Sequence, residues 1–264
     1  GAVAQILHLI KHHVAPVTVE PLPCPDNPGV VDEAMKKEPV NPPAQTPLRL
    51  RRAQLSDEVA GHLRAAIMSG TLRPGTFVRL DETAALLGVS ITPVREALLK
   101  LSGEGMVRLE PHRGYIVVPF SRTDIEDIFW LQATIARELA KTTAANITDG
   151  EIDELTALND VLADAVARAH PQDVANAEFA FHRVLNRSAG RVKLAWFLLH
   201  AARYMPPLTY AGDPGWGADT LDNHRKLIAA LRARDADAAA RSTEWQFTDA
   251  ARRLTELLEA SGIW

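Results

Sequence analysis

The residue types best suited to chemistry gather between Ser90 and Arg95. Ser90 and Thr92 stand at the predicted start of a short helix, where hydroxyls and free backbone amides suit phosphate oxygens. Arg95 follows one turn later on the polar face, where its planar guanidinium can reach a guanine edge in the major groove. These residues in this order predict contact with DNA.

A second basic element follows at Arg113 and Gly114, in a predicted turn between two strands. Arg113 is placed to enter the neighbouring minor groove, and Gly114 lets the backbone approach closely. Three more arginines are candidates for phosphate contacts, with a solvated surface role equally open: Arg64, Arg73 and Arg79.

Two short helices must position these side chains. Apolar residues recur every four positions from Leu55 to Ile67, which predicts a first helix that Gly70 ends. Asp81 can cap a short helix that stops at Gly88, and another helix follows with Pro93 in its first turn. This arrangement is typical of a helix-turn-helix.

The pattern then changes to alternation at 106–110 and to β-branched and aromatic residues at 115–118, which predicts a β-hairpin. We therefore expect a winged helix-turn-helix over residues 50–120, with three helices plus a β-hairpin wing. The residues after Ser121 are helical throughout, and we expect an all-α six-helix bundle over 121–264. The expected helices are 122–146, 149–169, 172–189, 191–204, 219–233 and 235–261. The fold class is mainly α.

Residues 1–49 are rich in proline and predict an extended, flexible arm. The net charge of −4 for the whole chain disfavours a nucleic-acid partner, but the charge is unevenly distributed. Residues 49–120 carry +3 and residues 121–264 carry −5, so positive charge coincides with the predicted DNA-binding segment. The single cysteine, Cys24, fits a cytoplasmic protein, and no apolar run is long enough to span a membrane.

The segment Gly-Val-Ser-Ile-Thr-Pro-Val-Arg-Glu-Ala-Leu at 88–98, with the turn before it and the wing after it, resembles the GntR superfamily of bacterial regulators. The helical part resembles the FCD ligand-binding domain of the FadR-type branch, through the segments EFAFHRVLNRSAG and DNHRKLIAALRARDADAAA. Within the DNA-binding segment, the sequence departs from the family at one position. Ile91 occupies a position where the family commonly has a base-reading arginine, and isoleucine can contact only a thymine methyl.

The resemblance also implies a divalent metal, since many members hold one with an Asp-x-x-x-His pair and two more histidines. The corresponding residues here are Glu178, His182, His224 and Gln246. Glu178 and His182 share one helix face, and zinc, manganese or nickel suits such a set. Gln246 replaces a nitrogen ligand with a weak amide oxygen, so a weakened metal site and a polar pocket without metal stay equally open.

The family's effector pocket adjoins the metal and commonly takes small carboxylates or sugar acids. Gln132 stands where the family usually carries an arginine. Four other residues are candidates for effector contacts instead: Arg137, Arg183, Arg203 and Tyr204.

The favoured function is a ligand-responsive regulator, not an enzyme, that binds an inverted-repeat operator in double-stranded DNA as a homodimer. Two alternatives stay open. One is an effector-blind regulator with a degenerate pocket, which the changes at Gln132 and Gln246 favour. The other is a metal-dependent enzyme. Loss of the imidazole ligand that Gln246 replaces would leave an open coordination position for a substrate, whereas the intact DNA-binding motif disfavours this alternative.

Overall fold

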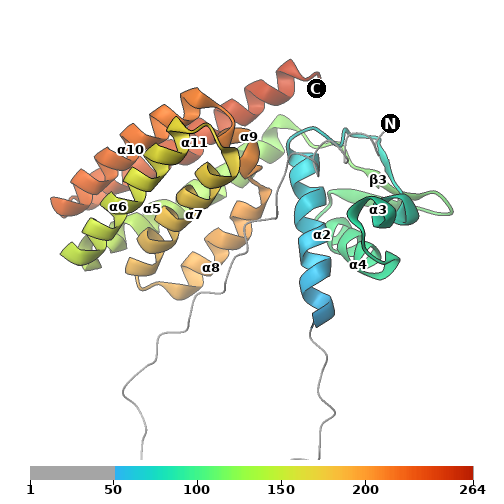
Figure 1. The fold of residues 1–264 in the computed structure, drawn as a ribbon, viewed down its shortest axis with the longest axis horizontal. Coiled ribbons are helices and arrows are strands. Elements are labelled where there is room, and N and C mark those ends of the chain that lie inside the picture. Colours follow the sequence, from blue (N-terminus) through green and yellow to red (C-terminus); the bar gives the residue numbers. More distant parts are fainter. Residues whose placement is uncertain (1–50, 264) are drawn as a thin grey trace, which may run out of the picture.

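A computed structural model describes residues 51–263, which form a winged helix and a helical domain side by side (Figure 1). The predicted proline-rich arm, residues 1–49, lies outside the described residues. Within the described part of the chain, no helix is both long and apolar enough to cross a membrane.

The winged helix contains three helices, as predicted. They are α2 (Arg51–Met68), α3 (Leu80–Leu87) and α4 (Ile91–Gly103). Helix α2 buries Leu63 and Ile67 against the apolar face of α4, where Leu98 and Leu101 are fully buried. Gly88 ends α3 in the left-handed conformation (φ 66°), as its placement predicts.

The wing is a small antiparallel sheet in the order β1-β3-β2. Its strands are β1 (Phe77–Val78), β2 (Val107–Glu110) and β3 (Gly114–Val117). The hairpin of β2 and β3 was predicted, and its register pairs Val107 with Val117. The two-residue strand β1 was not predicted, because two residues are too short to show alternation.

The helical domain is a layered bundle in which the two longest helices, α5 and α11, pack along each other. The spacing of Ser121 with Asp124 and of Thr148 with Glu151 predicts two capping boxes, and both are present. The helices are α5 (Arg122–Asn146), α6 (Asp149–Ala167), α7 (Pro171–Ser188), α8 (Val192–Ala201), η1 (a 3-10 turn, Ala202–Tyr204), α9 (Pro207–Ala211), α10 (Pro214–Arg232) and α11 (Ala236–Ala260).

The six expected helices are present, but the segment between α8 and α10 differs from the prediction. Pro207 and Pro214 predict breaks between the expected helices, whereas each occupies the first turn of a helix. Proline is tolerated there because its missing amide hydrogen has no partner within the helix. The short helix α9 is therefore additional, and α10 begins five residues earlier than expected.

A buried ion pair of the winged helix lies against the helical domain. Arg64 on α2 donates two hydrogen bonds to Glu104 at the end of α4, from Nε at 2.8 Å and from Nη2 at 2.6 Å. The guanidinium carbon of Arg64 also lies 5.8 Å from the ring centre of Tyr204 in η1. The pair thus joins the first helix, the end of α4 and the helical domain.

Removal of one partner from this pair should destabilise the protein. The Arg64 and Glu104 side chains are only 6% and 23% exposed, so Glu104→Ala leaves a buried charge uncompensated and should lower the free energy of unfolding by about 3 kcal/mol. The double variant Arg64→Met/Glu104→Leu should recover most of this loss. Chemical denaturation measures both variants.

The matched control is Glu110→Ala, which breaks an exposed pair with Arg108 and should cost below about 1 kcal/mol. Equal losses in Glu104→Ala and in this control would contradict the role assigned to the buried pair.

Candidate DNA-binding surface and metal centre

The start of α4 is an exposed polar surface. Ser90 is the N-cap, and its side chain makes no capping hydrogen bond, so the hydroxyl is free for another acceptor or donor. Ile91 and Thr92 are also exposed. The first amides of a helix lack partners within it, and together with these hydroxyls they suit a phosphate group.

Arg95 projects from the same end of α4. The opposite face of the helix buries Val94, Ala97 and Leu98, which fixes the helix rotation and directs Arg95 outward. Within residues 51–263, Arg95 is exposed and takes part in no hydrogen bond or ion pair. The sequence also allows a salt bridge from Arg95 to Glu58 or Glu96, and the described structure contains neither pair.

The wing presents Arg113 beside Gly114. The guanidinium carbon of Arg113 lies 4.3 Å from the ring centre of Phe77, which stacks the side chain at the wing and leaves it exposed. Gly114 has φ 102°, and a Cβ there would lie 3.0 Å from the carbonyl oxygen of Val78. Both constraints require glycine at this position.

The structure corrects the expectation for Arg64. Its guanidinium is occupied by Glu104 and buried between the domains, so it is not available to a DNA phosphate in this conformation. Arg73 donates to the carbonyl oxygen of Ser261, and Arg79 forms an exposed pair with Glu82. The sequence pattern on α2 gave no sign of the Arg64 pairing, because its partner is 40 residues away.

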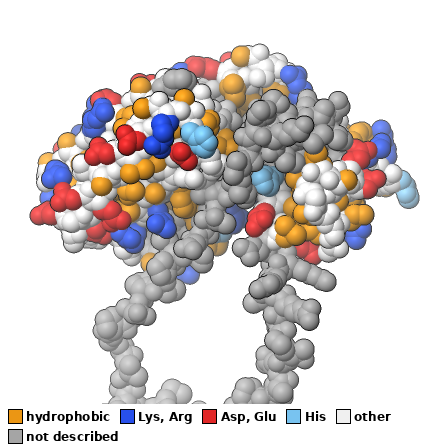
Figure 2. Space-filling view, viewed as in Figure 1, with side chains coloured by type: hydrophobic (Ala, Val, Ile, Leu, Met, Phe, Trp, Pro, Cys, Tyr) orange, Lys and Arg blue, Asp and Glu red, His pale blue; other side chains and the backbone are white. Residues whose placement is uncertain are grey.

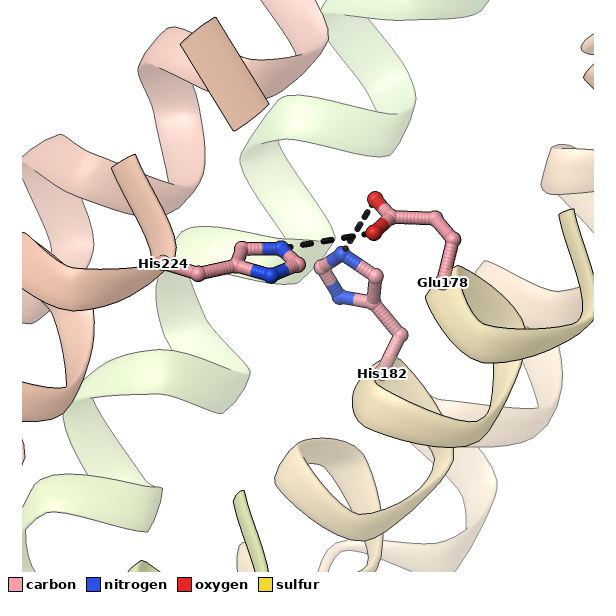
Figure 3. Close-up of side chains that lie close together, drawn as sticks. All are labelled: Glu178, His182 and His224. Carbon is pink, nitrogen blue, oxygen red and sulfur yellow. Dashed lines mark hydrogen bonds and ion pairs between the residues drawn. The ribbon is translucent and has the colours of Figure 1, made fainter. Parts of the chain in front are cut away.

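The four predicted metal-site residues do come together. Glu178 and His182 project from α7 and His224 projects from α10, and the three point at one another (Figure 3). Their ligand atoms all lie within 4.8 Å of one another. His182 Nε2 is 3.2 Å from Glu178 Oε1, and His224 Nε2 is 3.5 Å from Glu178 Oε2.

His224 is held in the orientation that a metal ligand needs. Its Nδ1 lies 3.2 Å from Oδ1 of the buried Asn159, and its ring stacks on Phe181 with 3.7 Å between centres. An amide oxygen only accepts, so Nδ1 carries the proton and the lone pair of Nε2 faces Glu178. Burial lowers the pKa of His224 to about 4, against the opposing effect of Glu178. Sequence reasoning missed Asn159, which belongs to no motif and comes from α6.

Gln246 completes the cluster from α11. Its Nε2 donates to Glu178 and lies 3.0 Å from His182 Nε2. Three buried atoms of the cluster have no hydrogen-bond partner: Glu178 Oε2, His224 Nε2 and Gln246 Oε1. Two of these acceptors, Glu178 Oε2 and His224 Nε2, lie 3.5 Å apart. Such a pair is costly without a cation or donor between them, so the donor set fits a divalent metal ion.

The four effector candidates are not brought together. Arg137 pairs with Glu244 at 3.2 Å, and Arg183 is exposed on α7. Arg203 and Tyr204 instead line a cavity at the domain junction. Gln132 is fully buried, and its amide donates to the carbonyl oxygen of Ala201 at 2.9 Å.

The architecture is a winged helix-turn-helix joined to a helical bundle that holds a buried carboxylate–imidazole cluster, and a winged helix is a DNA-binding module. Residues 55–117 match the family described as bacterial regulatory proteins, gntR family, and residues 127–244 match the FCD domain. The chain belongs to the GntR family, in the branch that carries an FCD domain. The FadR-type assignment is consistent with these matches.

The relatives extend over most of the described chain. An uncharacterized HTH-type transcriptional regulator of the TAR-I ttuE-ttuC' intergenic region in Agrobacterium vitis is 34% identical over 47% of this chain and 74% of its own length. The gluconate operon transcriptional repressor of Bacillus licheniformis is 24% identical, covering 79% of this chain and 88% of its own. The structure of E. coli McbR/YncC shares the fold, with a TM-score of 0.62, 23% identity, and coverage of 76% of this chain and 97% of its own.

The buried His224 should make the free energy of unfolding depend on pH. Its pKa of about 4 in the folded protein lies below the ordinary value of 6.5, so the unfolded chain binds more protons between these values and stability falls as the pH decreases. Between pH 7 and pH 5 the contribution of His224 should fall by about 2 kcal/mol. Denaturation with a chelator present measures this change, and His224→Gln should show a correspondingly flatter profile. An unchanged profile in the variant would contradict the assignment.

Proposed function

We propose that this protein is a ligand-responsive transcription regulator that binds an inverted-repeat operator in double-stranded DNA as a homodimer. The observation that carries the proposal is the exposed start of α4, where Ser90, Thr92 and Arg95 have no competing partners in the described structure. A single winged helix reaches one half-site, and two-fold pairing supplies the second. On the face seen in Figure 2, acidic and basic side chains intermingle over the helical domain, which offers DNA no uniformly basic surface.

We assign the DNA contacts to Ser90, Ile91, Thr92 and Arg95 on α4, with Arg113 and Gly114 at the wing. Arg95 reads a guanine edge, Ser90 and Thr92 bind phosphates, and Ile91 contacts a thymine methyl. Such a regulator acts in the bacterial cytoplasm. We place the boundary between its two domains near residue 120.

We propose a small carboxylate or a sugar acid as the effector. A relative that covers most of this chain is named for a gluconate operon, and gluconate is a sugar acid. Effector binding in the helical domain would favour one spacing of the two DNA-binding heads over another. Release of DNA on addition of such compounds supports this proposal. A DNA affinity that none of them changes favours the effector-blind alternative.

We propose no catalytic activity, because the relatives are named as regulators. We assign a divalent metal, zinc, manganese or nickel, to Glu178, His182 and His224, with Gln246 as a weak fourth ligand. Rotation of the Gln246 amide would exchange Nε2 for the unpartnered Oε1, which then faces the cation. Metal-dependent turnover of a substrate would instead favour the enzyme alternative.

Replacement of Arg95 tests the DNA-binding proposal. Arg95→Ala should weaken binding to an operator selected from genomic fragments by about 10- to 100-fold, because a lost base contact costs about 1–3 kcal/mol. The unfolding midpoint should not change, since Arg95 supports no contact within the described fold. Fluorescence anisotropy at fixed salt measures the affinity.

The matched control is Arg241→Ala, which removes an exposed arginine from α11 in the helical domain. Equal affinity in the wild type, Arg95→Ala and this control would rule out the proposed surface.

Replacement of Gln246 tests the metal proposal. Gln246→His supplies an imidazole in place of the amide and should raise zinc affinity at least about tenfold. Asn159→Ala removes the group that orients His224 and should lower the affinity by about 10- to 100-fold. Competition with a chromogenic chelator measures both. The metal site would be refuted if neither the wild type nor Gln246→His binds zinc stoichiometrically.

A further inference from the structure

A cavity of about 470 Å³ opens at the junction of the two domains. Its walls come from the end of α4, from α5, and from α8 with the η1 turn. None of the four metal-site residues lines it. Its volume falls in the range of pockets for small organic ligands, and neither the DNA-binding surface nor the metal cluster uses it.

One wall of the cavity is apolar. It is formed by Leu131, Ile135, Leu194 and Phe197. Leu131 and Phe197 are 45% and 55% exposed, although side chains of this kind are usually buried. Burial of these two side chains by an apolar group removes apolar surface from water, which is favourable, so the wall favours a ligand with an apolar body.

The polar groups of the cavity favour an anion. Glu104 is already neutralised, since Arg64 donates to both of its carboxylate oxygens. Arg203 is exposed and takes part in no hydrogen bond or ion pair with other described residues. The Nδ1 atom of His200 lies 2.8 Å from the carbonyl oxygen of Trp196. The uncompensated charge in the lining is therefore positive.

We propose that this cavity binds an amphipathic carboxylate, with its apolar body against Leu131 and Phe197 and its carboxylate on Arg203. The cavity is separate from the metal cluster, and its ligand differs in chemistry from the sugar acid proposed as the effector. It shares a wall with the DNA-binding domain through Glu104, the residue that caps α4. A ligand there contacts both domains at once and so favours one relative orientation of them.

The test uses octanoate, with 1-octanol as the uncharged analogue and the full chain without DNA. Wild-type protein should bind octanoate saturably in calorimetry and with a change in tryptophan fluorescence, and should bind octanol at least fivefold more weakly. Arg203→Gln should lower octanoate affinity at least fivefold and leave octanol affinity unchanged. Phe197→Ser should weaken both ligands. The control Arg241→Gln should change neither.

Two results would overturn the proposal. One is octanoate binding that Arg203→Gln and Phe197→Ser leave unaltered. The other is no saturable binding of octanoate in the wild type. If Phe197→Ser then dissociates into monomers on sedimentation, the apolar wall belongs to an interface with a second copy of the chain. Because DNA is absent, the outcome is independent of the proposed DNA-binding function.

Discussion

The buried pair between Arg64 and Glu104 is the contact on which the arrangement of this protein depends. Neither group tolerates burial alone, so α2, the end of α4 and the η1 turn are held at one junction. With its C-terminal end fixed there, α4 presents its N-terminal end outward. The same pair occupies an arginine that sequence alone would assign to DNA, and its Glu104 lines the junction cavity.

In the helical domain, too, buried polar groups need partners. Asn159 satisfies one nitrogen of His224, and the other nitrogen faces Glu178 without a partner. Gln246 places an amide nitrogen where the family commonly has an imidazole, and its donated hydrogen bond partly compensates the Glu178 charge. The cluster is thus compatible with a folded protein before metal binds, and a cation would satisfy the acceptors that remain.

Much of the fold could be predicted from the sequence because its signals are local. The four-residue spacing from Leu55 to Ile67, the glycine stops and the two capping boxes each act within one or two helical turns. The missed features depend on distant partners or on very short elements. Arg64 meets Glu104 across 40 positions, Asn159 meets His224 across 65, and α9 contains only five residues. The metal-site residues were found by resemblance, whereas the separation of Arg203 and Tyr204 from them required the structure.

The central claim is that α4 reads base edges through Arg95, and guanine methylation interference on the selected operator tests it most directly. A methyl group on guanine N7 blocks the major-groove acceptor that an arginine uses. We predict interference at symmetry-related guanines in the two half-sites for the wild type, and loss of that interference in Arg95→Ala at protein concentrations that restore binding. The same interference pattern in both proteins, or none in the wild type, would contradict this account.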